Sequence, residues 1–326
     1  MCKRTRFFCG LALAFAFGAG IVHPAGAEDF PSRPITFIVP WGPGGGADGL
    51  ARLTGKLLEP ELKVSVPVIN VPGATGQNGL AKLVTSPADG YTIEVVTGDT
   101  AALFASPQSR FKLDQLTPLA VLIQQASGFY VSTTGTMKNW DDVLKAAQAT
   151  EQKVAITGYG SPDVMTVNYF KERGLKLQGI PFPEPGLRYS SVVGGQSDIL
   201  YEQAGDVRSF IDGKQIMPVL FFSKSPVSGF ESVPYSGKLG YDVQLMQFRV
   251  IVVRAGTDPA IVKRLADAFA KIAAEPAYVA YLKQQYALPD SFLPQAESVR
   301  YLQSWLGEAR SLAGLAGSKA TRAAPK

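Results

Sequence analysis

The sequence predicts an α/β fold made of two α/β lobes with a cleft between them. Short apolar runs rich in β-branched residues alternate with helical patterns from residue 35 onward, which predicts a parallel sheet with helices on its faces. The alternation restarts near residue 140, after two neighbouring strand patterns separated by a polar break. A tail with helical patterns alone begins at residue 259. We therefore expect two sheets of βαβ type, with the tail packed back on the first.

The first half of the chain contains three strand patterns and two glycine-rich loops. Each of the first two strands is followed by such a loop and then by a helix, and a turn at Asp89-Gly90 precedes the third strand. In chain order we expect strand Ile35–Val39, loop Pro40–Ala47, a helix from Asp48 to about Leu62, strand Val64–Val71, loop Pro72–Gly79, a short helix to about Val84, and strand Tyr91–Val96.

The second half repeats the alternation and then gives way to the tail. Because the tail has no strand patterns, we expect a discontinuous lobe 1 of residues 28–125 plus 249–326, and a lobe 2 of residues 126–248. Residues 181–186 and 223–238 are rich in Pro, Gly and Ser and are expected to be connections. The expected elements are strands Leu119–Gln124 and Gly128–Ser132, helix Trp140–Thr150, strand Val154–Thr157, loop Gly158–Pro162 with a helix ending near Gly174, strands Asp198–Tyr201 and Ile216–Phe222 with a helix between them, strand Gln247–Val253, and helices Pro259–Ala274, Pro276 to about Tyr286, and Glu297–Leu312.

The N-terminus has the three parts of a secretory signal peptide. Lys3, Arg4 and Arg6 precede the apolar run Phe7–Phe17, and Ala25-Gly26-Ala27 supplies the small residues of a cleavage site. The apolar run is about half the roughly 20 residues that a membrane-spanning helix needs. We expect residues 1–27 to be removed and the protein to enter the periplasm, leaving 299 residues (326 less 27). A retained N-terminal anchor is the alternative.

Removal of that leader would also remove every cysteine and the one histidine. Cys2, Cys9 and His23 all lie before the expected cleavage site. Ser-His-Asp and Cys-His catalysis need an imidazole, and common zinc sites need Cys or His ligands. We therefore expect no catalytic residues, no metal site, no cofactor and no disulfide. A chain of this length is able to form ordinary cores without them, usually as two domains.

The charge pattern gives no sign of a nucleic-acid or membrane partner. The formal net charge of +5 falls to +2 (5 less 3) without Lys3, Arg4 and Arg6, and no run of five basic residues occurs. A nucleic-acid-binding protein would carry a basic patch. The longest later apolar candidate, Phe248–Val253, carries Arg249. We expect a soluble monomer without a nucleic-acid partner.

The glycine loops are candidate anion sites. A loop between a strand and a helix directs free backbone N–H groups and the positive end of the helix dipole at one place. The loops Pro40–Ala47 and Pro72–Gly79 follow successive strands of one sheet, so both are expected at its carboxyl edge, where open α/β sheets bind ligands. The loop Gly158–Pro162 repeats the pattern in the second half. For any one loop, the alternative is that its glycines only allow the backbone to turn and bind no ligand.

Two nucleotide-binding motifs offer rival interpretations of the first loop. A P-loop would end in Gly-Lys-Ser/Thr, whereas this loop ends in Gly46-Ala47-Asp48, which excludes it. Gly42, Gly44 and Ala47 do match the dinucleotide fingerprint. However, the second strand ends without the acidic residue that would bind a ribose. A secreted α/β enzyme or dinucleotide-binding protein that uses the Gly42–Ala47 loop therefore remains the alternative function.

Several side chains near these loops have two possible roles each. Asp48 either caps the helix or also fixes the loop that binds the ligand, and Trp41 belongs either to the core or to the cleft wall. Arg188 and Arg249 are able to pair with a ligand carboxylate, although a surface or interlobe ion pair is favoured for each. Glu202 follows an apolar strand and is expected at the carboxyl end of that strand.

Motifs along nearly the whole expected mature chain resemble one known family. The motifs are Pro31–Ile35, Val39–Asp48, Pro72–Gly76, Asp89–Thr92, Gly160–Pro162, Gly194–Asp198 and Ala255–Pro259. In these motifs the chain is similar to the tripartite tricarboxylate transporter receptors, also called Bug proteins. This resemblance implies a type II periplasmic binding protein-like fold, a small organic acid as ligand, and membrane permease subunits as partners.

The resemblance also implies a division of labour at the site. In that family the first two glycine loops hold one ligand carboxylate through backbone groups and ordered water, and positions mostly in the second lobe select the rest of the ligand. The ligand-binding residues predicted for this chain are Trp41, Gly44, Gly45, Gly46, Asp48, Gly73, Ala74, Thr75, Gly76, Gln77, Thr97, Tyr159, Ser161 and Glu202.

Departures from the family pattern lie mainly in the selecting part. They are the segment Pro181–Gly186, the pair Glu202-Gln203, and Gln247-Phe248-Arg249 in place of a Trp-Phe-Gly run; Thr75 and Gln77 replace Gly and Asn in the second loop. We expect the first two glycine loops to bind a ligand carboxylate as they do in the family, whereas the rest of the ligand differs from the family's ligands. An effector-sensing domain of a regulator is a third hypothesis, against which the signal peptide and the lack of a DNA-binding helix pair argue.

Overall fold

The computed structural model describes residues 30–106 and 109–315. The predicted signal peptide, residues 1–27, lies outside the described residues. Within the described residues, no helix has both the length and the apolar character needed to span a bilayer.

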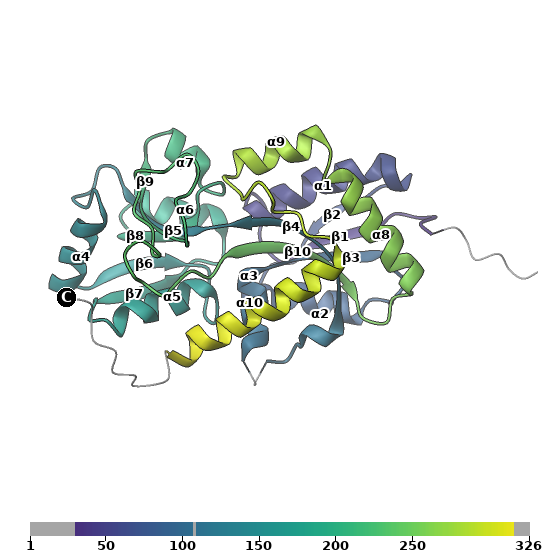
Figure 1. Cartoon of the computed structure of the whole chain (residues 1–326), viewed down its shortest axis with the longest axis horizontal. Coiled ribbons are helices and arrows are strands. Elements are labelled where there is room, and N and C mark those ends of the chain that lie inside the picture. The colour runs from purple at the N-terminus through teal and green to yellow at the C-terminus, as the bar shows by residue number, and fades with distance from the viewer. Residues whose placement is uncertain (1–29, 107–108, 316–326) are drawn as a thin grey trace, which may run out of the picture. The chain divides into compact units, whose positions relative to one another are not determined.

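The first sheet has the strand order β2-β1-β3-β10-β4, drawn in Figure 1. β1 is parallel to β2 and β3, whereas β10 is antiparallel to both β3 and β4. The expectation of a parallel sheet is therefore wrong for this edge. β4 leaves for the second sheet and β10 returns from it, so these neighbours run in opposite directions. The strands are β1 Thr36–Val39, β2 Val68–Asn70, β3 Thr92–Thr97, β4 Leu116–Gln125 and β10 Gln247–Arg254.

The second sheet repeats the arrangement of the first, with the order β7-β6-β8-β5-β9. β6 is parallel to β7 and β8, and β5 is antiparallel to β8 and β9. Only Ala126 separates β4 from β5, so the polar break predicted there is the point at which the chain changes sheets. The strands are β5 Ser127–Ser132, β6 Gln152–Ile156, β7 Leu177–Pro181, β8 Ile199–Gln203 and β9 Ile216–Phe222.

Helices follow the strands in both halves, as the alternation predicts. β7 and α6 were not predicted, because Pro181–Gly186 resembles a connection, although its second half opens a helix with Pro185 in the first turn. The helices are α1 Gly46–Leu62, α2 Gln77–Thr85, α3 Gly98–Ala102, α4 Trp140–Ala149, α5 Pro162–Lys171, α6 Pro185–Val193, α7 Arg208–Asp212, α8 Pro259–Ile272, α9 Pro276–Gln284 and α10 Gln295–Leu315, with short 3-10 turns η1 Ala74–Gly76, η2 Leu103–Ala105 and η3 Leu113–Gln115.

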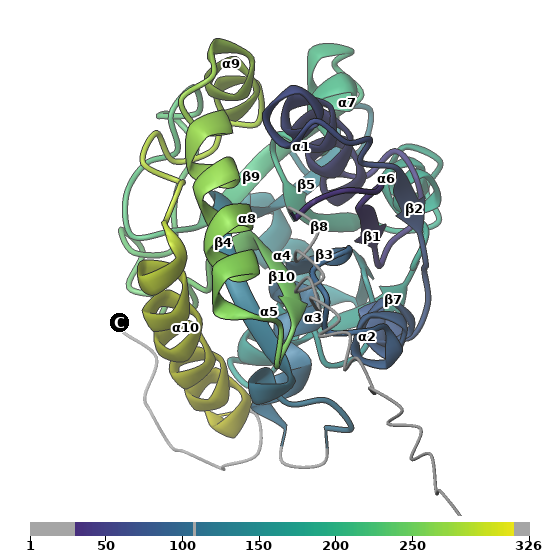
Figure 2. The same ribbon diagram turned by 90° about the vertical axis from the view of Figure 1, so that its right-hand side faces the viewer.

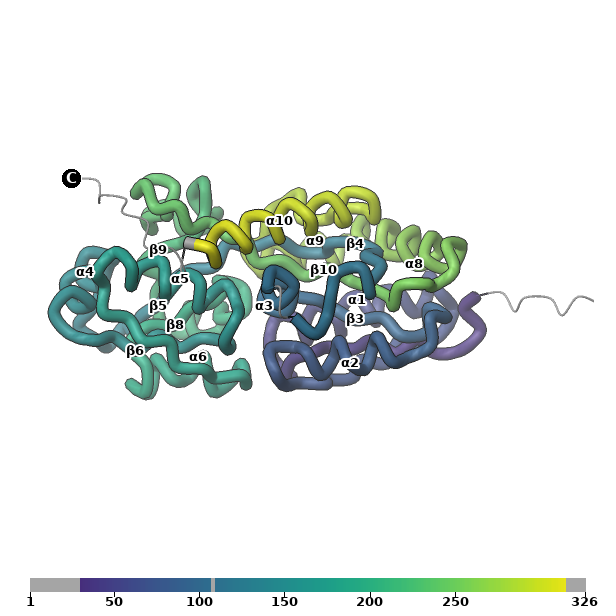
Figure 3. The backbone as a smooth tube through the Cα atoms, turned by 90° about the horizontal axis from the view of Figure 1, so that it is seen from below, coloured from purple at the N-terminus to yellow at the C-terminus, as the bar shows by residue number. Residues whose placement is uncertain are grey.

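The C-terminal tail packs on the first sheet, which confirms that prediction. α8 and α10 both contact β4, and α8 also lies beside α1, as Figure 2 shows. Figure 3 shows α10 running along β4 and β10. Val121 and Leu293 exchange two backbone hydrogen bonds, with N···O distances of 3.1 and 2.9 Å. The tail therefore covers the edge strand β4, which protects its unpaired backbone groups.

Candidate functional site

Asp48 fixes the first glycine loop from within the first turn of α1. α1 begins at Gly46, with Gly45 as N-cap, so the prediction that Asp48 caps this helix is wrong by three positions. Its Oδ2 instead accepts from the backbone N–H of Gly44 at 3.1 Å, and both carboxylate oxygens bind the Arg52 guanidinium at 3.0 and 2.8 Å. Burial alone would raise the pKa of Asp48, but hydrogen bonds from Arg52, Asn70 and Gly44 outweigh it and lower the pKa below its ordinary value.

The second glycine loop has an unusual backbone. Gly73, Ala74, Thr75 and Gly76 all have positive φ angles, between +49° and +123°. A β-branched residue in this region is a strained outlier, and such strain clusters at ligand clamps and functional loops. The hydroxyl of Thr75 donates to the carbonyl of Tyr159, 3.4 Å away in the third loop. The loop that opens α2 therefore touches the second half of the molecule.

The third glycine loop is closed by its own hydrogen bonds. Ser161 is fully buried, and its hydroxyl contacts the Gly158 carbonyl and the Asp163 carboxylate. Asp163 also accepts from the N–H groups of Thr157 at 2.5 Å and Val164 at 2.7 Å. Tyr159, in contrast, is 71% exposed. Ser161 therefore stabilises the conformation of its own loop, while Tyr159 lies at the surface.

A small charged cavity lies where the first loop meets the second sheet's elements. Its volume is about 30 Å³, room for only two or three water molecules at about 10–15 Å³ each. Five predicted site residues line it: Trp41, Gly45, Gly46, Thr97 and Glu202. The other nine lie outside its lining: Gly44, Asp48, Gly73, Ala74, Thr75, Gly76, Gln77, Tyr159 and Ser161.

Two buried ion pairs occupy the walls of this cavity. Arg188 on α6 binds Glu202 on β8 through two bonds, Nε at 3.0 Å and Nη2 at 2.8 Å. Arg249 on β10 binds Asp206, after β8, at 2.5 Å. All four side chains are between 3 and 7% exposed. The Arg249 pair joins elements of the two sheets, in agreement with the predicted interlobe pair. For Arg188 the prediction of a surface or interlobe pair is wrong, because its pair with Glu202 is buried among elements of the second sheet alone.

Two carboxyl groups in the cavity have raised pKa values. Burial, with the nearby charges of Asp163 and Glu202, raises the pKa of Asp99 to about 7, although Gln247 donates to this carboxyl at 2.8 Å. Burial also raises the pKa of Asp206 to about 6, against the opposing effect of Arg249. These carboxyl groups therefore titrate near neutral pH.

The first loop and the second sheet's side chains approach each other closely. A Cβ atom at Gly46 would overlap both Asp206 and Arg249, and one at Gly42 would overlap the carboxylate of Glu184. A Cβ at Gly45 would lie 3.0 Å from Pro185 Cγ. Glycine at these positions thus allows the two halves to close on one another.

Sequence reasoning missed both aspartates of the cavity. Asp99 and Asp206 line it together with the predicted residues. Asp99 and Asp206 each lie two or three residues beyond the end of a strand, β3 and β8 respectively. The rule that ligand-binding groups follow the carboxyl ends of strands, applied to every strand, would have found both.

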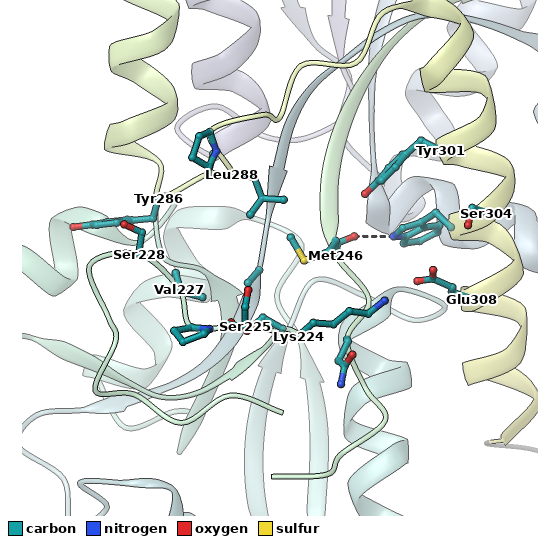
Figure 4. Close-up of a pocket in the computed structure, with 17 residues that line it drawn as sticks. Lys224, Ser225, Val227, Ser228, Met246, Tyr286, Leu288, Tyr301, Ser304 and Glu308 are labelled. Carbon is teal, nitrogen blue, oxygen red and sulfur yellow. Dashed lines mark hydrogen bonds between the residues drawn. The ribbon is translucent and has the colours of Figure 1, made fainter. Parts of the chain in front are cut away.

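A larger cavity of about 450 Å³ lies at the crossing between the sheets, where Ala126 and Met246 are found. Figure 4 shows Tyr301, Ser304 and Glu308 of α10 on one side, and Val227, Ser228 and Tyr286 on the other. The indole N–H of Trp305 donates to the Met246 carbonyl at 2.7 Å. None of the predicted site residues lines this larger cavity, and neither do the Arg188–Glu202 and Arg249–Asp206 pairs. It therefore lacks the backbone N–H groups and the buried charges that characterise the smaller cavity.

Comparison with solved structures defines the class of protein. A TctC solute binding protein from Polaromonas superposes with a TM-score of 0.65 at 24% identity, covering 88% of this chain and 99% of that one. A Rhodopseudomonas palustris protein, MatC, with bound malate gives 0.79 at 20% identity, covering 87% and 99%. R. palustris Rpa4515 with adipate gives 0.82 at 18% identity, covering 89% and 99%. The fold is that of a periplasmic binding protein, as predicted.

Sequence comparison then gives the family. The profile described as "Tripartite tricarboxylate transporter family receptor" matches residues 50–302, so the chain belongs to this receptor family. Protein BugT of Bordetella pertussis is 27% identical over 256 residues, 76% of this chain and 78% of that protein. A UPF0065 protein of Pseudomonas sp., from the tcbD-tcbE intergenic region, is 26% identical over 290 residues, covering 86% and 85%. The predicted family is confirmed, and a receptor is favoured over the enzyme and dinucleotide alternatives.

Proposed function

We propose that this chain is a periplasmic receptor that captures a small organic acid between two lobes and passes it to the permease subunits of a tripartite tricarboxylate-type transporter. Membership of the receptor family carries this proposal. The malate and adipate in two structures of the same fold are small organic acids, which supports the ligand class. The proposed lobes are residues 28–125 plus 249–326 and residues 126–248, which follow the division into two sheets.

The proposed carboxylate grip is built from the first two glycine loops. α1 begins at Gly46, and the N–H groups in the first turn of a helix have no partner within the helix. The strained second loop opens α2 at the same edge of the sheet. Trp41, Gly45, Gly46 and Thr97 line the cavity on this side, with Glu202 opposite. Because the cavity holds only about 30 Å³, the ligand enters an arrangement in which the lobes are further apart. The predicted contacts of the ligand with the second loop, residues Gly73–Gln77, form in that more open arrangement.

The proposal includes a monomeric, non-enzymatic protein without a cofactor. Among the described residues, no group of three or more His, Cys, Asp or Glu side chains is placed to hold a metal ion. Export by the signal peptide of residues 1–27 is part of the proposal, and the N-terminal mass of the periplasmic protein tests it.

A thermal-shift screen of mono-, di- and tricarboxylates, amino acids and aromatic acids tests the proposed function. An acid present at 100 times its dissociation constant stabilises the native state by about 2.7 kcal/mol, which is readily measured. Calorimetry then gives stoichiometry, with one site expected per chain. If no small acid raises the melting temperature, the proposed function is wrong.

A further inference from the structure

The cavity of the proposed site contains more acidic than basic side chains. Among the described residues that line it, Asp99, Glu202 and Asp206 carry carboxyl groups, whereas Arg188 and Arg249 carry guanidinium groups. A fourth buried carboxyl, Asp163, lies close enough to Asp99 to raise its pKa. A site for a dianion would have the opposite balance, because each buried like charge strongly disfavours the next.

Both guanidinium groups are already committed to partners in the protein. Arg188 binds Glu202 and donates to the Phe182 carbonyl at 2.9 Å. Arg249 binds Asp206 and donates from Nη1 to the amide oxygen of Gln125 at 2.7 Å. Asp99 makes no ion pair within the described part of the chain, and the side chain that donates to its carboxyl is the neutral amide of Gln247. Asp99 is therefore the carboxyl group of the cavity that no guanidinium group compensates.

Three buried polar atoms on the cavity walls have no hydrogen-bond partner among the described residues. Two are donors, Trp41 Nε1 and Arg249 Nε, and one is an acceptor, Asp206 Oδ1. Their side chains are at most 8% exposed. Buried polar groups are normally satisfied, and each unsatisfied one requires an explanation. A ligand that satisfies all three must supply both hydrogen-bond acceptors and a donor.

We propose that the ligand is a zwitterion, an organic acid that also carries a protonated nitrogen. This inference rests on the proposed function above. The carboxylate binds the side of the first loop, where the start of α1 and the indole of Trp41 offer donors. The ammonium group binds between Asp99 and the free oxygen of Asp206. Asp99 follows β3 of the first sheet and Asp206 follows β8 of the second, so a ligand bound to both bridges the two halves.

Pairs of acids that differ only in the amino group test this proposal. Aspartate is compared with succinate, glutamate with glutarate, and 4-aminomethylbenzoate with benzoate, within a panel of the protein amino acids and simple amines, by calorimetry on the exported protein. We expect an amino-bearing acid to bind at least tenfold more tightly than its amine-free partner. An amine-free acid that binds as tightly as its partner overturns the proposal but leaves the proposed function standing.

Two isosteric variants locate the cationic subsite. Asp99→Asn and Asp206→Asn each remove one carboxyl group of the proposed cationic subsite, so the preference for the amino-bearing acid over its amine-free partner should fall at least fivefold. The matched control is Asp114→Asn, an exposed carboxylate on η3, which should leave the preference unchanged. Circular dichroism shows before titration whether each variant is folded. If one of the two aspartate variants fails to fold, the other alone tests the proposed subsite.

The remaining outcomes distinguish a failure of the zwitterion proposal from a failure of the proposed function. If Asp99→Asn and Asp206→Asn both keep the full preference, the ammonium group is not bound there and the proposal is wrong. If simple amines without a carboxylate bind as tightly as the amino acids, the anionic half is wrong. If nothing in the panel binds, the proposed function fails, and this inference fails with it.

Discussion

The two buried ion pairs of the cavity have the same chemistry but different positions in the fold. Arg188 and Glu202 both belong to elements of the second sheet, α6 and β8. Arg249 lies on β10 of the first sheet, whereas Asp206 follows β8 of the second. Separation of the lobes would leave the first pair intact and break the second.

This difference separates a structural role from a role in closure. A buried ion pair is weak evidence for stability, because desolvation offsets most of the Coulomb attraction, but removal of one partner is strongly destabilising. Arg188 and Glu202 lie on elements of one sheet, so this pair does not depend on closure of the lobes to bring its partners together. Asp206 escapes the same cost when the lobes separate and water reaches it. The Arg188 pair should therefore control folding, and the Arg249 pair should control the balance between closed and separated lobes.

The largest expected effect is that of Arg188→Met. This change leaves the Glu202 carboxylate buried without its bidentate partner, which should lower the free energy of unfolding by about 3–5 kcal/mol. Urea denaturation measures the loss. The double variant Arg188→Met/Glu202→Gln removes both charges and should recover most of it. A single variant within about 1 kcal/mol of the natural protein would contradict the structural role of this pair.

The second prediction concerns pH. Asp206 is faced by Arg249 from β10, Glu202 from β8 and Arg188 from α6, and burial raises its pKa from 3.8 to about 6. A carboxyl whose pKa is higher in the closed arrangement than in water holds its proton more tightly there. Closure is therefore favoured by acid and opposed as the pH rises from about 4 through 6, by about 1.4 kcal/mol for each unit of pKa difference. Asp99, with a pKa of about 7, extends this window upward.

Solution scattering of the ligand-free protein checks the pH prediction. The radius of gyration should be larger at pH 8 than at pH 5, and Asp206→Asn should reduce the difference because it removes one titrating group. A protein that compacts instead between pH 5 and 8 would show that Arg249 outweighs burial at this site.

The smallest expected effect on stability is that of Arg249→Met. Because Asp206 is able to regain water when the lobes separate, the free energy of unfolding should fall by only about 1–2 kcal/mol, while the radius of gyration increases. Arg254→Met is the matched control: Arg254 lies on the same strand and donates to the Ser86 carbonyl outside the cavity, so scattering should be unchanged. Equal losses for Arg249→Met and Arg188→Met, without expansion, would remove the distinction between the two pairs.

Most helices and strands were predicted from patterns among residues that are close together in the sequence. Strand Ile216–Phe222 has the predicted ends, and all three glycine loops lie between a strand and a helix. These features follow from local periodicity and turn chemistry. β7 and α6 were missed because Pro183, Pro185 and Gly186 obscure the pattern at their junction.

The cavity was harder to predict than the loops that border it. Glu202 and Arg188 were each noted, but their pairing requires β8 and α6 to be adjacent, and no spacing in the sequence states this. Asp206 and Arg249 are 43 residues apart and meet only when the two sheets approach. Ser161 and Tyr159 were predicted alike, yet one is fully buried and the other is 71% exposed, because burial depends on which loop packs against them.

By itself, the sequence determined the family, the two α/β halves and the glycine loops, because helix and strand periodicity and glycine turns are local properties of the chain. It also predicted a carboxylate grip built on the backbone groups of the glycine loops. Only the tertiary structure decided the antiparallel return of β10, the burial of both ion pairs and the negative balance of the cavity. Those features depend on which distant side chains share a low-dielectric space, and the free energy of a buried charge is set by its neighbours in that space rather than by its neighbours in the chain.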